Sequence, residues 1–334
     1  MLRHKIISVI IAMLLIATQI GCSSASDKKN NETGASKKQT SSQVSADSNG
    51  NKDEAEGKSS GTDYEDKEKA LLDEFNALNA LAQNDTEITE IVEFINKNIS
   101  SVSPKNASVM INVLEKAQEE HLPQLEEMIN KSDAVKKNIE DELGAGLDIS
   151  KADSTTDEEL KKLLIYMRDN GFKFETAEGY FFPVINYEFY KKYSSYVTDD
   201  IRDYIDIMAV ESNNVPAKDA ALLISWDEVI TRALSHESFI KKYNDSGKVD
   251  DVKQLYKKYV YFTLYGTDNT PLFSHDKKLM VPDAKTSYTN AAANSEGSEY
   301  LKMIADYIEV LEKNGYKLTN EVEDFRNKAL ESVN

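Results

Sequence analysis

Residues 70–81 read ALLDEFNALNAL, and this stretch sets the pattern for the folded part of the chain. Its large apolar side chains recur at spacings of three and four residues, namely Leu71, Leu72, Phe75, Leu78 and Leu81. Such spacing places them on one face of an α-helix. The stretch therefore predicts an amphipathic helix that buries this face against neighbouring elements.

The same helical period returns along most of residues 64–334. Further helices are predicted at 85–95, 103–129, 132–143, 157–170, 187–196, 199–211, 217–243, 249–265, 283–293, 299–313 and 320–332. Pro123 is expected to kink or break the second of these, because proline lacks an N–H for the helical ladder. Residues 144–156, GAGLDISKADSTT, have no helical stripe and form the predicted internal subdomain boundary.

The period changes at residues 172–183, FKFETAEGYFFP. Phe172 to Thr176 alternates like a strand, residues 177–179 are turn formers, and Pro183 is expected to end the second strand. The fold class is thus mainly α: a multi-helix antiparallel bundle or an irregular array of helical hairpins, with one small β-hairpin near 172–183. Short connections between the predicted helices favour antiparallel neighbours.

Aromatic residues gather around this hairpin and form a possible binding surface. Aromatic side chains stack on sugar rings and anchor protein partners. The candidates include one residue of the long loop 266–282: Tyr180, Phe181, Phe182, Tyr187 and Phe273. The alternative is that these aromatic rings, and the apolar residues of the loop, pack in the core. Trp226, in an apolar stretch, is expected to be buried.

The N-terminus carries basic residues and then a short apolar run, IISVIIAMLLIA at residues 6–17. This pattern is typical of a secretory signal peptide, and the run is too short to span a bilayer. The following Gln19-Ile20-Gly21-Cys22 resembles the lipobox of bacterial lipoproteins, although Gln19 replaces the usual aliphatic residue. Only this segment carries the resemblance.

The resemblance implies cleavage between Gly21 and Cys22 and attachment of acyl chains such as palmitate at Cys22. It also implies a protein anchored to the cell membrane by lipid and facing outside, so that the membrane is its first partner. Cys22 is the only cysteine and cannot form an internal disulfide. Plain secretion with cleavage after Ala25, or an uncleaved anchor, are the alternatives.

Residues 22–63 are the lipidated cysteine and a low-complexity stretch of mostly polar residues, predicted to be a disordered tether. The folded, extracytoplasmic domain is expected at 64–334. Frequent Lys and Asn are typical of a low-GC Gram-positive source. The formal net charge of −18 argues against binding nucleic acid and against docking onto anionic lipid by charge.

Motifs for metal binding, cofactors or catalysis are missing. The histidines are far apart, no His-Glu-x-x-His or glycine-rich phosphate loop occurs, and no catalytic cysteine or Gly-x-Ser-x-Gly is present. We therefore predict no metal, no cofactor and no catalytic residue. Glu175 and Glu178 are the only conceivable acid pair. His236 and Glu237 are interpreted as a solvated helix face, and so are Asp199, Asp203 and Asp206.

The leading functional hypothesis is a non-enzymatic binding or protein-interaction module at the cell envelope. Its partner would be an envelope protein or a cell-wall polymer. One alternative is the solute-binding receptor of an importer, although such receptors need two α/β lobes with parallel sheets. A second alternative is a cell-wall hydrolase that uses paired carboxylates.

Overall fold

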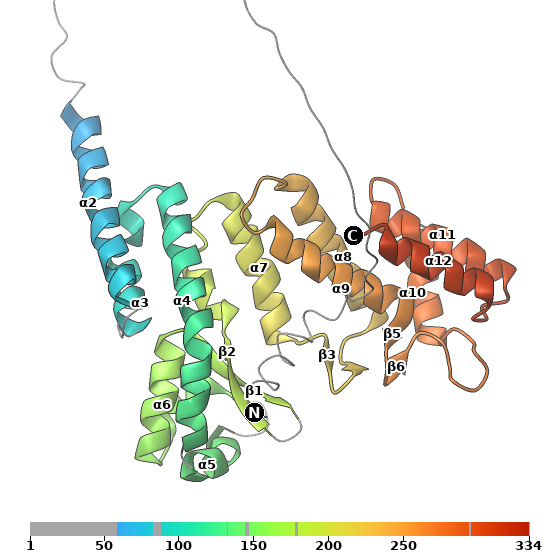
Figure 1. Cartoon of the computed structure of the whole chain (residues 1–334), viewed down its shortest axis with the longest axis horizontal. Coiled ribbons are helices and arrows are strands. Elements are labelled where there is room, and N and C mark those ends of the chain that lie inside the picture. Colours follow the sequence, from blue (N-terminus) through green and yellow to red (C-terminus); the bar gives the residue numbers. More distant parts are fainter. Residues whose placement is uncertain are drawn as a thin grey trace, which may run out of the picture. The chain divides into compact units, whose positions relative to one another are not determined.

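The described part of the chain is mainly helical, with three small antiparallel hairpins (Figure 1). This computed structural model describes residues 59–82, 88–131, 133–143, 147–177, 180–293 and 295–333. The signal segment, Gly21, Cys22 and most of the proposed tether lie outside the described residues. The chain divides into two units, 1–65 and 66–334, and the second is described by itself below.

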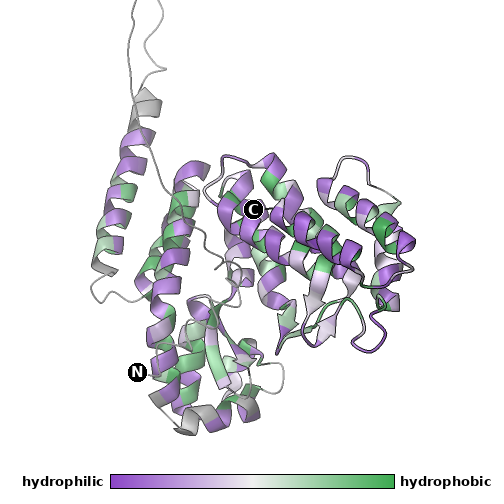
Figure 2. Cartoon of the chain, turned by 45° about the vertical axis from the view of Figure 1, so that its right-hand side comes forward, coloured by the Kyte–Doolittle hydropathy of each residue, from purple (hydrophilic) through white to green (hydrophobic). Residues whose placement is uncertain are grey.

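Helices form the framework of this second unit, and residues 59–65 of the first helix belong to the first unit. The α-helices are α2 (Ser59–Ala82), α3 (Ile88–Asn98), α4 (Pro104–Lys131), α5 (Asp133–Leu143), α6 (Glu158–Asp169), α7 (Asp199–Asn213), α8 (Trp226–Lys242), α9 (Val249–Tyr265), α10 (Pro282–Ala292), α11 (Glu299–Lys313) and α12 (Asn320–Glu331). Short 3-10 helices are η1 (Ile99–Ser101), η2 (Ile149–Ser154) and η3 (Tyr187–Tyr193). The mainly-α prediction is confirmed, and hydrophobic and hydrophilic residues alternate around these helices (Figure 2).

The predicted hairpin at 172–183 is confirmed as β1 (Phe172–Ala177) paired with β2 (Tyr180–Ile185). The prediction that Pro183 ends the second strand is wrong, because Pro183 lies within β2, opposite Phe174. Two further hairpins have strands of two residues each: β3 (Ala217–Lys218) with β4 (Ala221–Leu222), and β5 (Gly266–Thr267) with β6 (Thr270–Pro271). All strand pairs among the described residues are antiparallel.

Two hydrophobic cores lie within this unit, here named the first and the second core. The first core is built from α2 to α7 with β1, β2 and η3, and it also takes in Phe239 of α8 and Val252 and Leu255 of α9. The second core holds the remaining buried apolar residues of α8 and α9 together with α10 to α12. The helical hairpin of α8 and α9 thus contributes to both cores.

Several element boundaries differ from the sequence predictions. α2 begins at Ser59, inside the stretch expected to be tether, and α4 continues through Pro123 instead of breaking there. The predicted helix at 217–243 is wrong in its first third, because β3 and β4 occupy it and α8 begins at Trp226. The residues on either side of 144–156 contribute to the same first core.

Some predicted residues now have a defined place in the fold. Trp226 is buried in the second core, as predicted. Loop 266–282 contains β5 and β6 and buries Leu272, Phe273 and Met280 in the second core. Apolar loop residues therefore cover the core, which was one of the two interpretations of this loop.

Candidate functional site

The aromatic surface predicted from the sequence divides into exposed and buried members. Tyr180 is 74% exposed at the start of β2, and Phe181 and Phe182 are half-buried. Tyr187 and Phe273 are buried, so their rings pack in the cores and do not form a surface. The structure therefore leaves Tyr180 as the one strongly exposed residue of this set.

Tyr187 has a structural partner instead. Its hydroxyl donates to Glu115 Oε1 at 2.6 Å, and the Tyr204 hydroxyl donates to the same oxygen at 2.8 Å. Lys248 Nζ donates to the other carboxylate oxygen at 2.5 Å. Burial is the largest cause that raises the pKa of both tyrosines; the next cause is Tyr204 and then Glu115 for Tyr187, and Glu115 for Tyr204, so both stay protonated as donors. This buried network ties α4 to η3, α7 and the residue before α9.

The acid pair proposed for hydrolysis receives no support from the described residues. Glu175 lies in β1 opposite Phe182, and Glu178 lies outside the described residues. Within the described ranges, no three His, Cys, Asp or Glu side chains converge as ligands of a metal ion would. None of the described helices is both long and apolar enough to cross a membrane.

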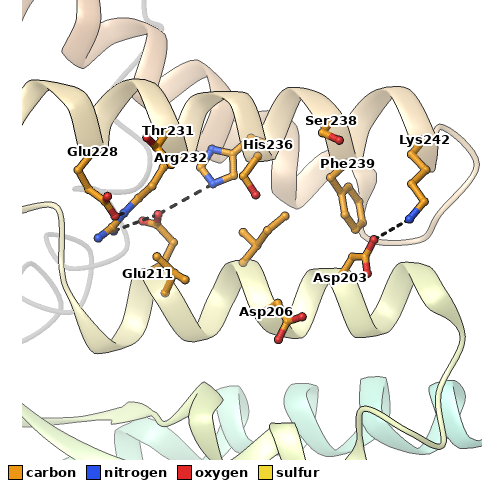
Figure 3. A pocket seen from close by; sticks show the side chains of 13 residues that line it. Asp203, Asp206, Glu211, Glu228, Thr231, Arg232, His236, Ser238, Phe239 and Lys242 are labelled. Atoms are coloured by element: carbon orange, nitrogen blue, oxygen red, sulfur yellow. Dashed lines mark hydrogen bonds and ion pairs between the residues drawn. The ribbon is translucent and has the colours of Figure 1, made fainter. Parts of the chain in front are cut away.

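A groove between α7 and α8 is the strongest candidate site (Figure 3). Its volume is about 430 Å³, within the range of ligand-binding pockets. The two helices are antiparallel, so Glu211 faces Arg232 at one end and Asp203 faces Lys242 at the other. Eight residues of helix separate Asp203 from Glu211, which makes the groove about 12 Å long.

The polar side chains of the groove are brought together by their positions on the two helices. Glu211 lies four residues after Ile207 and seven after Tyr204, on the buried face of α7. Arg232 and His236 follow Val229 by three and seven residues on α8, which is also the spacing of one helix face. The apolar stripes that attach the two helices to the cores thus carry three polar side chains inward. The N-cap Ser225, whose Oγ accepts from Glu228 N–H, fixes the start of α8.

Arg232 is the centre of the polar end of the groove and is 3% exposed. Its Nε donates to Glu228 at 2.8 Å, and its Nη1 lies within 3.3 Å of Glu211 Oε1, Asn214 O and the Tyr259 hydroxyl. Burial alone would lower the pKa of Arg232, but the hydrogen bond to Glu228 and the nearby groups of Tyr259 and Glu211 raise it. Arg232 is therefore a fixed cation.

His236 lies one turn further along α8 and is 1% exposed. Its Nε2 is 3.9 Å from Glu211 Oε1, too far for a hydrogen bond. Its ring meets that of Tyr259 edge to face, with centroids 5.0 Å apart. Burial, together with the positive charges of Arg232 and Lys258, lowers the pKa of His236 to about 3. The imidazole is therefore neutral at physiological pH.

Two buried polar atoms of this groove lack a hydrogen-bond partner. Among the described residues, neither Arg232 Nη2 nor His236 Nδ1 is paired. A buried donor or acceptor without a partner costs about 1–3 kcal/mol of stability. Both atoms have almost no solvent-accessible surface, so they lie behind the wall of the groove and are not open to a ligand within it.

Sequence reasoning missed this site because it interpreted His236 and Glu237 as a solvated face. That interpretation is wrong, since both side chains are buried. Glu237 accepts from Ser298 Oγ at 2.6 Å and from Tyr300 N–H at 3.1 Å, so it holds the first turn of α11. The sequence did contain a signal for this site, namely polar residues at positions of the apolar stripe of α8.

Of the three aspartates expected on a wet face, Asp199 and Asp206 are exposed. Asp203 is half-buried and accepts hydrogen bonds from Lys242 Nζ at 3.0 Å and from the Tyr243 hydroxyl at 2.7 Å. It therefore helps to close the far end of the groove.

Comparison with known proteins finds no protein-family model, no curated protein and no solved structure that matches the chain.

Proposed function

We propose that this chain is a lipid-anchored, extracytoplasmic binding protein, without enzymatic activity, whose α7–α8 groove receives its ligand. The observation that carries the binding role is the groove itself, about 430 Å³ in volume, with the ion pair of Arg232 and Glu211 at one end and that of Lys242 and Asp203 at the other.

The charged groups at the groove are held too firmly to favour catalysis. Glu211 accepts from Tyr259 at 2.6 Å and from Arg232, and Arg232 in turn is bound to Glu228. His236 stays neutral because its pKa is lowered to about 3, so it cannot act as a general acid near pH 7. A fixed arrangement of donors and acceptors suits recognition.

The anchoring part of the proposal rests on the signal segment and on Cys22. Metabolic labelling with a palmitate analogue should mark the wild-type chain in the membrane fraction and fail to mark Cys22→Ser. Ser23→Ala is the matched control and should be labelled like wild type. Equal labelling of Cys22→Ser would overturn lipidation at this residue.

The groove is tested by placing a photo-crosslinking amino acid at Val210 on its rim. Val210 is 44% exposed, and Val109 on α4, at 45%, is the matched control outside the groove. Irradiation of intact cells should give an adduct at position 210 that is missing at position 109. The adduct should disappear when Ser235→Trp fills the groove. Adducts that survive this change, or that form at both positions, would place binding elsewhere.

A further inference from the structure

A second groove lies between α2 and α3, and it shares no residue with the α7–α8 groove. The two helices lie side by side, and the rings of Phe75 and Phe94 meet with their centroids 5.6 Å apart (Figure 1). Next to this contact the helices leave a groove of about 440 Å³, lined by three residues of α2 and four of α3. Its volume is within the range of binding sites.

The floor of the α2–α3 groove is apolar and partly open to solvent. Leu78 of α2 and Phe94 of α3 are half-buried and pack against the first core, and Ala77 is exposed beside them. A partner that covers this apolar surface gains about 25 cal/mol for each Å² removed from water. An exposed apolar surface surrounded by polar residues is typical of an interaction site.

The rim of the groove is acidic. Glu74 on α2 and Glu90 and Glu93 on α3 are exposed, and the described residues provide none of them with an ion-pair partner. Lys97, also exposed, is the only cation among the lining residues. Three carboxylates thus outnumber one ammonium group around an apolar floor, and the groove favours a partner with positive charges beside an apolar surface.

The charge of the groove disfavours three occupants. A second copy of this chain has a formal net charge of −18 and would bring further negative charge to the rim. Nucleic acid and anionic lipid are repelled for the same reason. The occupant is therefore a partner protein with a basic surface.

The shape of the groove indicates which structure that partner presents. A furrow between two helices that pack side by side accepts a third helix, because its ridge of side chains fits between theirs. Lys97 follows Glu90 by seven residues on α3, so the lined part of the groove is about 10 Å long, or about two turns of helix. An amphipathic helix lying in an apolar groove is a recurrent mode of recognition.

From this arrangement we infer that the α2–α3 groove binds an amphipathic helix of a partner protein, with Lys or Arg on both sides of its apolar stripe. The stripe packs on Leu78 and Phe94. Basic side chains on one edge of the helix lie toward Glu74, and those on the other edge lie toward Glu90 and Glu93. Their aliphatic stems cover the remaining apolar surface while their charged ends stay in water.

The experiment measures binding of the fluorescent peptide LKKLLKLLKKLLKL to the full chain by anisotropy at physiological ionic strength. As a helix, this peptide places its leucines on one face and its lysines on both sides of that face. The peptide LKLKLKLKLKLKLL has the same composition but the period of a strand, and it should bind at least about tenfold more weakly. Equal affinity for the two peptides would overturn a site shaped for a helix.

Neutralising the rim tests the charge. The triple variant Glu74→Gln, Glu90→Gln, Glu93→Gln should weaken binding of the helical peptide about tenfold or more, since each exposed ion pair contributes up to about fivefold.

The matched control removes the same charge from exposed positions of α11 and α12, with the substitutions Asp306→Asn, Glu309→Gln and Asp324→Asn. It should leave the affinity within about twofold. Equal weakening in the two triple variants would mean that the peptide responds only to the total charge of the protein, and would overturn the inference.

Filling the groove tests its place. Ala77→Trp should weaken binding at least about tenfold, whereas Asn76→Trp, at an exposed position of α2 outside the lining, should not. Thermal unfolding followed by circular dichroism verifies that both variants fold. Unchanged affinity in Ala77→Trp would overturn the inference, as would failure of the wild-type chain to bind the helical peptide at about 100 μM.

A last variant separates this groove from the one in the proposed function. Ser235→Trp fills the α7–α8 groove and should bind the helical peptide as the wild type does. Loss of binding in Ser235→Trp, together with unchanged binding in Ala77→Trp, would assign the peptide to the α7–α8 groove and overturn the inference.

Discussion

Substituting His236 tests the electrostatics of the groove directly. The folded protein holds the pKa of His236 near 3, whereas an unfolded chain has the usual value of about 6.5. Glu211 of α7, Arg232 of α8 and the α9 residues Lys258 and Tyr259 surround the ring. Between these two pKa values the unfolded chain binds a proton that the folded chain does not. The free energy of unfolding must therefore fall as the pH drops from 6.5 toward 3.

The size of the effect follows from the two pKa values. At pH 7 the unfolded imidazole is mostly neutral, so its protonation lowers the free energy of unfolding by only about 0.2 kcal/mol. At pH 5 the unfolded imidazole is almost fully protonated and the folded one is not, which removes about 2 kcal/mol. Solvent hardly screens the charges around this imidazole, because the side chain is 1% exposed.

The assay is urea unfolding at pH 7 and pH 5, followed by circular dichroism. Other groups also titrate in this range, so the comparison is between variants. The change in free energy of unfolding between the two pH values should be about 2 kcal/mol smaller in His236→Gln than in wild type. His275→Gln, at an exposed loop position, should behave as wild type. The same pH dependence in all three proteins would refute a buried, neutral His236.

Three further pairs of substitutions test the fold. Lys248→Met leaves Glu115 buried without its cation and should lower the free energy of unfolding in urea by about 3–5 kcal/mol. Lys253→Met breaks an exposed pair with Asp250 and should lower it by less than about 1 kcal/mol. Equal losses in both variants would contradict a buried pair of Lys248 and Glu115. Gly266 and Gly297 both have φ near +80°, but only at Gly266 would an added Cβ meet a backbone oxygen, that of Thr270 at 2.2 Å. Gly297→Ala should therefore cost about 1 kcal/mol, and Gly266→Ala should lower the melting temperature well beyond it. Pro123→Ala in the interior of α4 should stabilise the protein by about 1–2 kcal/mol, because proline lacks the N–H of the helical ladder, whereas Pro104→Ala at the first turn should not. A shift of the same sign and size in both variants would contradict a destabilising effect of Pro123.

Helices were predicted correctly from the sequence where the apolar stripe and the residues that end a helix indicate the same bounds. α9 and α11 have the predicted bounds, because their stripes are regular and Gly266 and Asn314-Gly315 follow their last turns. The start of α8 could not be predicted this way. Asp219 and Ala220 adopt positive φ between β3 and β4, and Ala220 O accepts from Asn269 N–H, a contact between residues distant in the sequence.

The candidate site was hidden from the sequence for a related reason. Periodicity places Arg232 and His236 on the buried stripe of α8, yet it cannot show that Glu211 lies opposite them. The pairing depends on how α7 and α8 pack, which is a property of the tertiary structure. Among the predicted aromatic residues, likewise, only the packing separates exposed Tyr180 from buried Tyr187.

The division of α9 between two cores has a consequence for how the molecule opens. Val252 and Leu255 belong to the first core, and Tyr259 and Val260, about one turn on, belong to the second. Loss of either core removes packing from one half of a single hydrogen-bonded helix, so the two cores should unfold as one cooperative unit. Backbone amides of α9 should accordingly be among the slowest to exchange with deuterium, at rates set by opening of the whole unit rather than by local fraying.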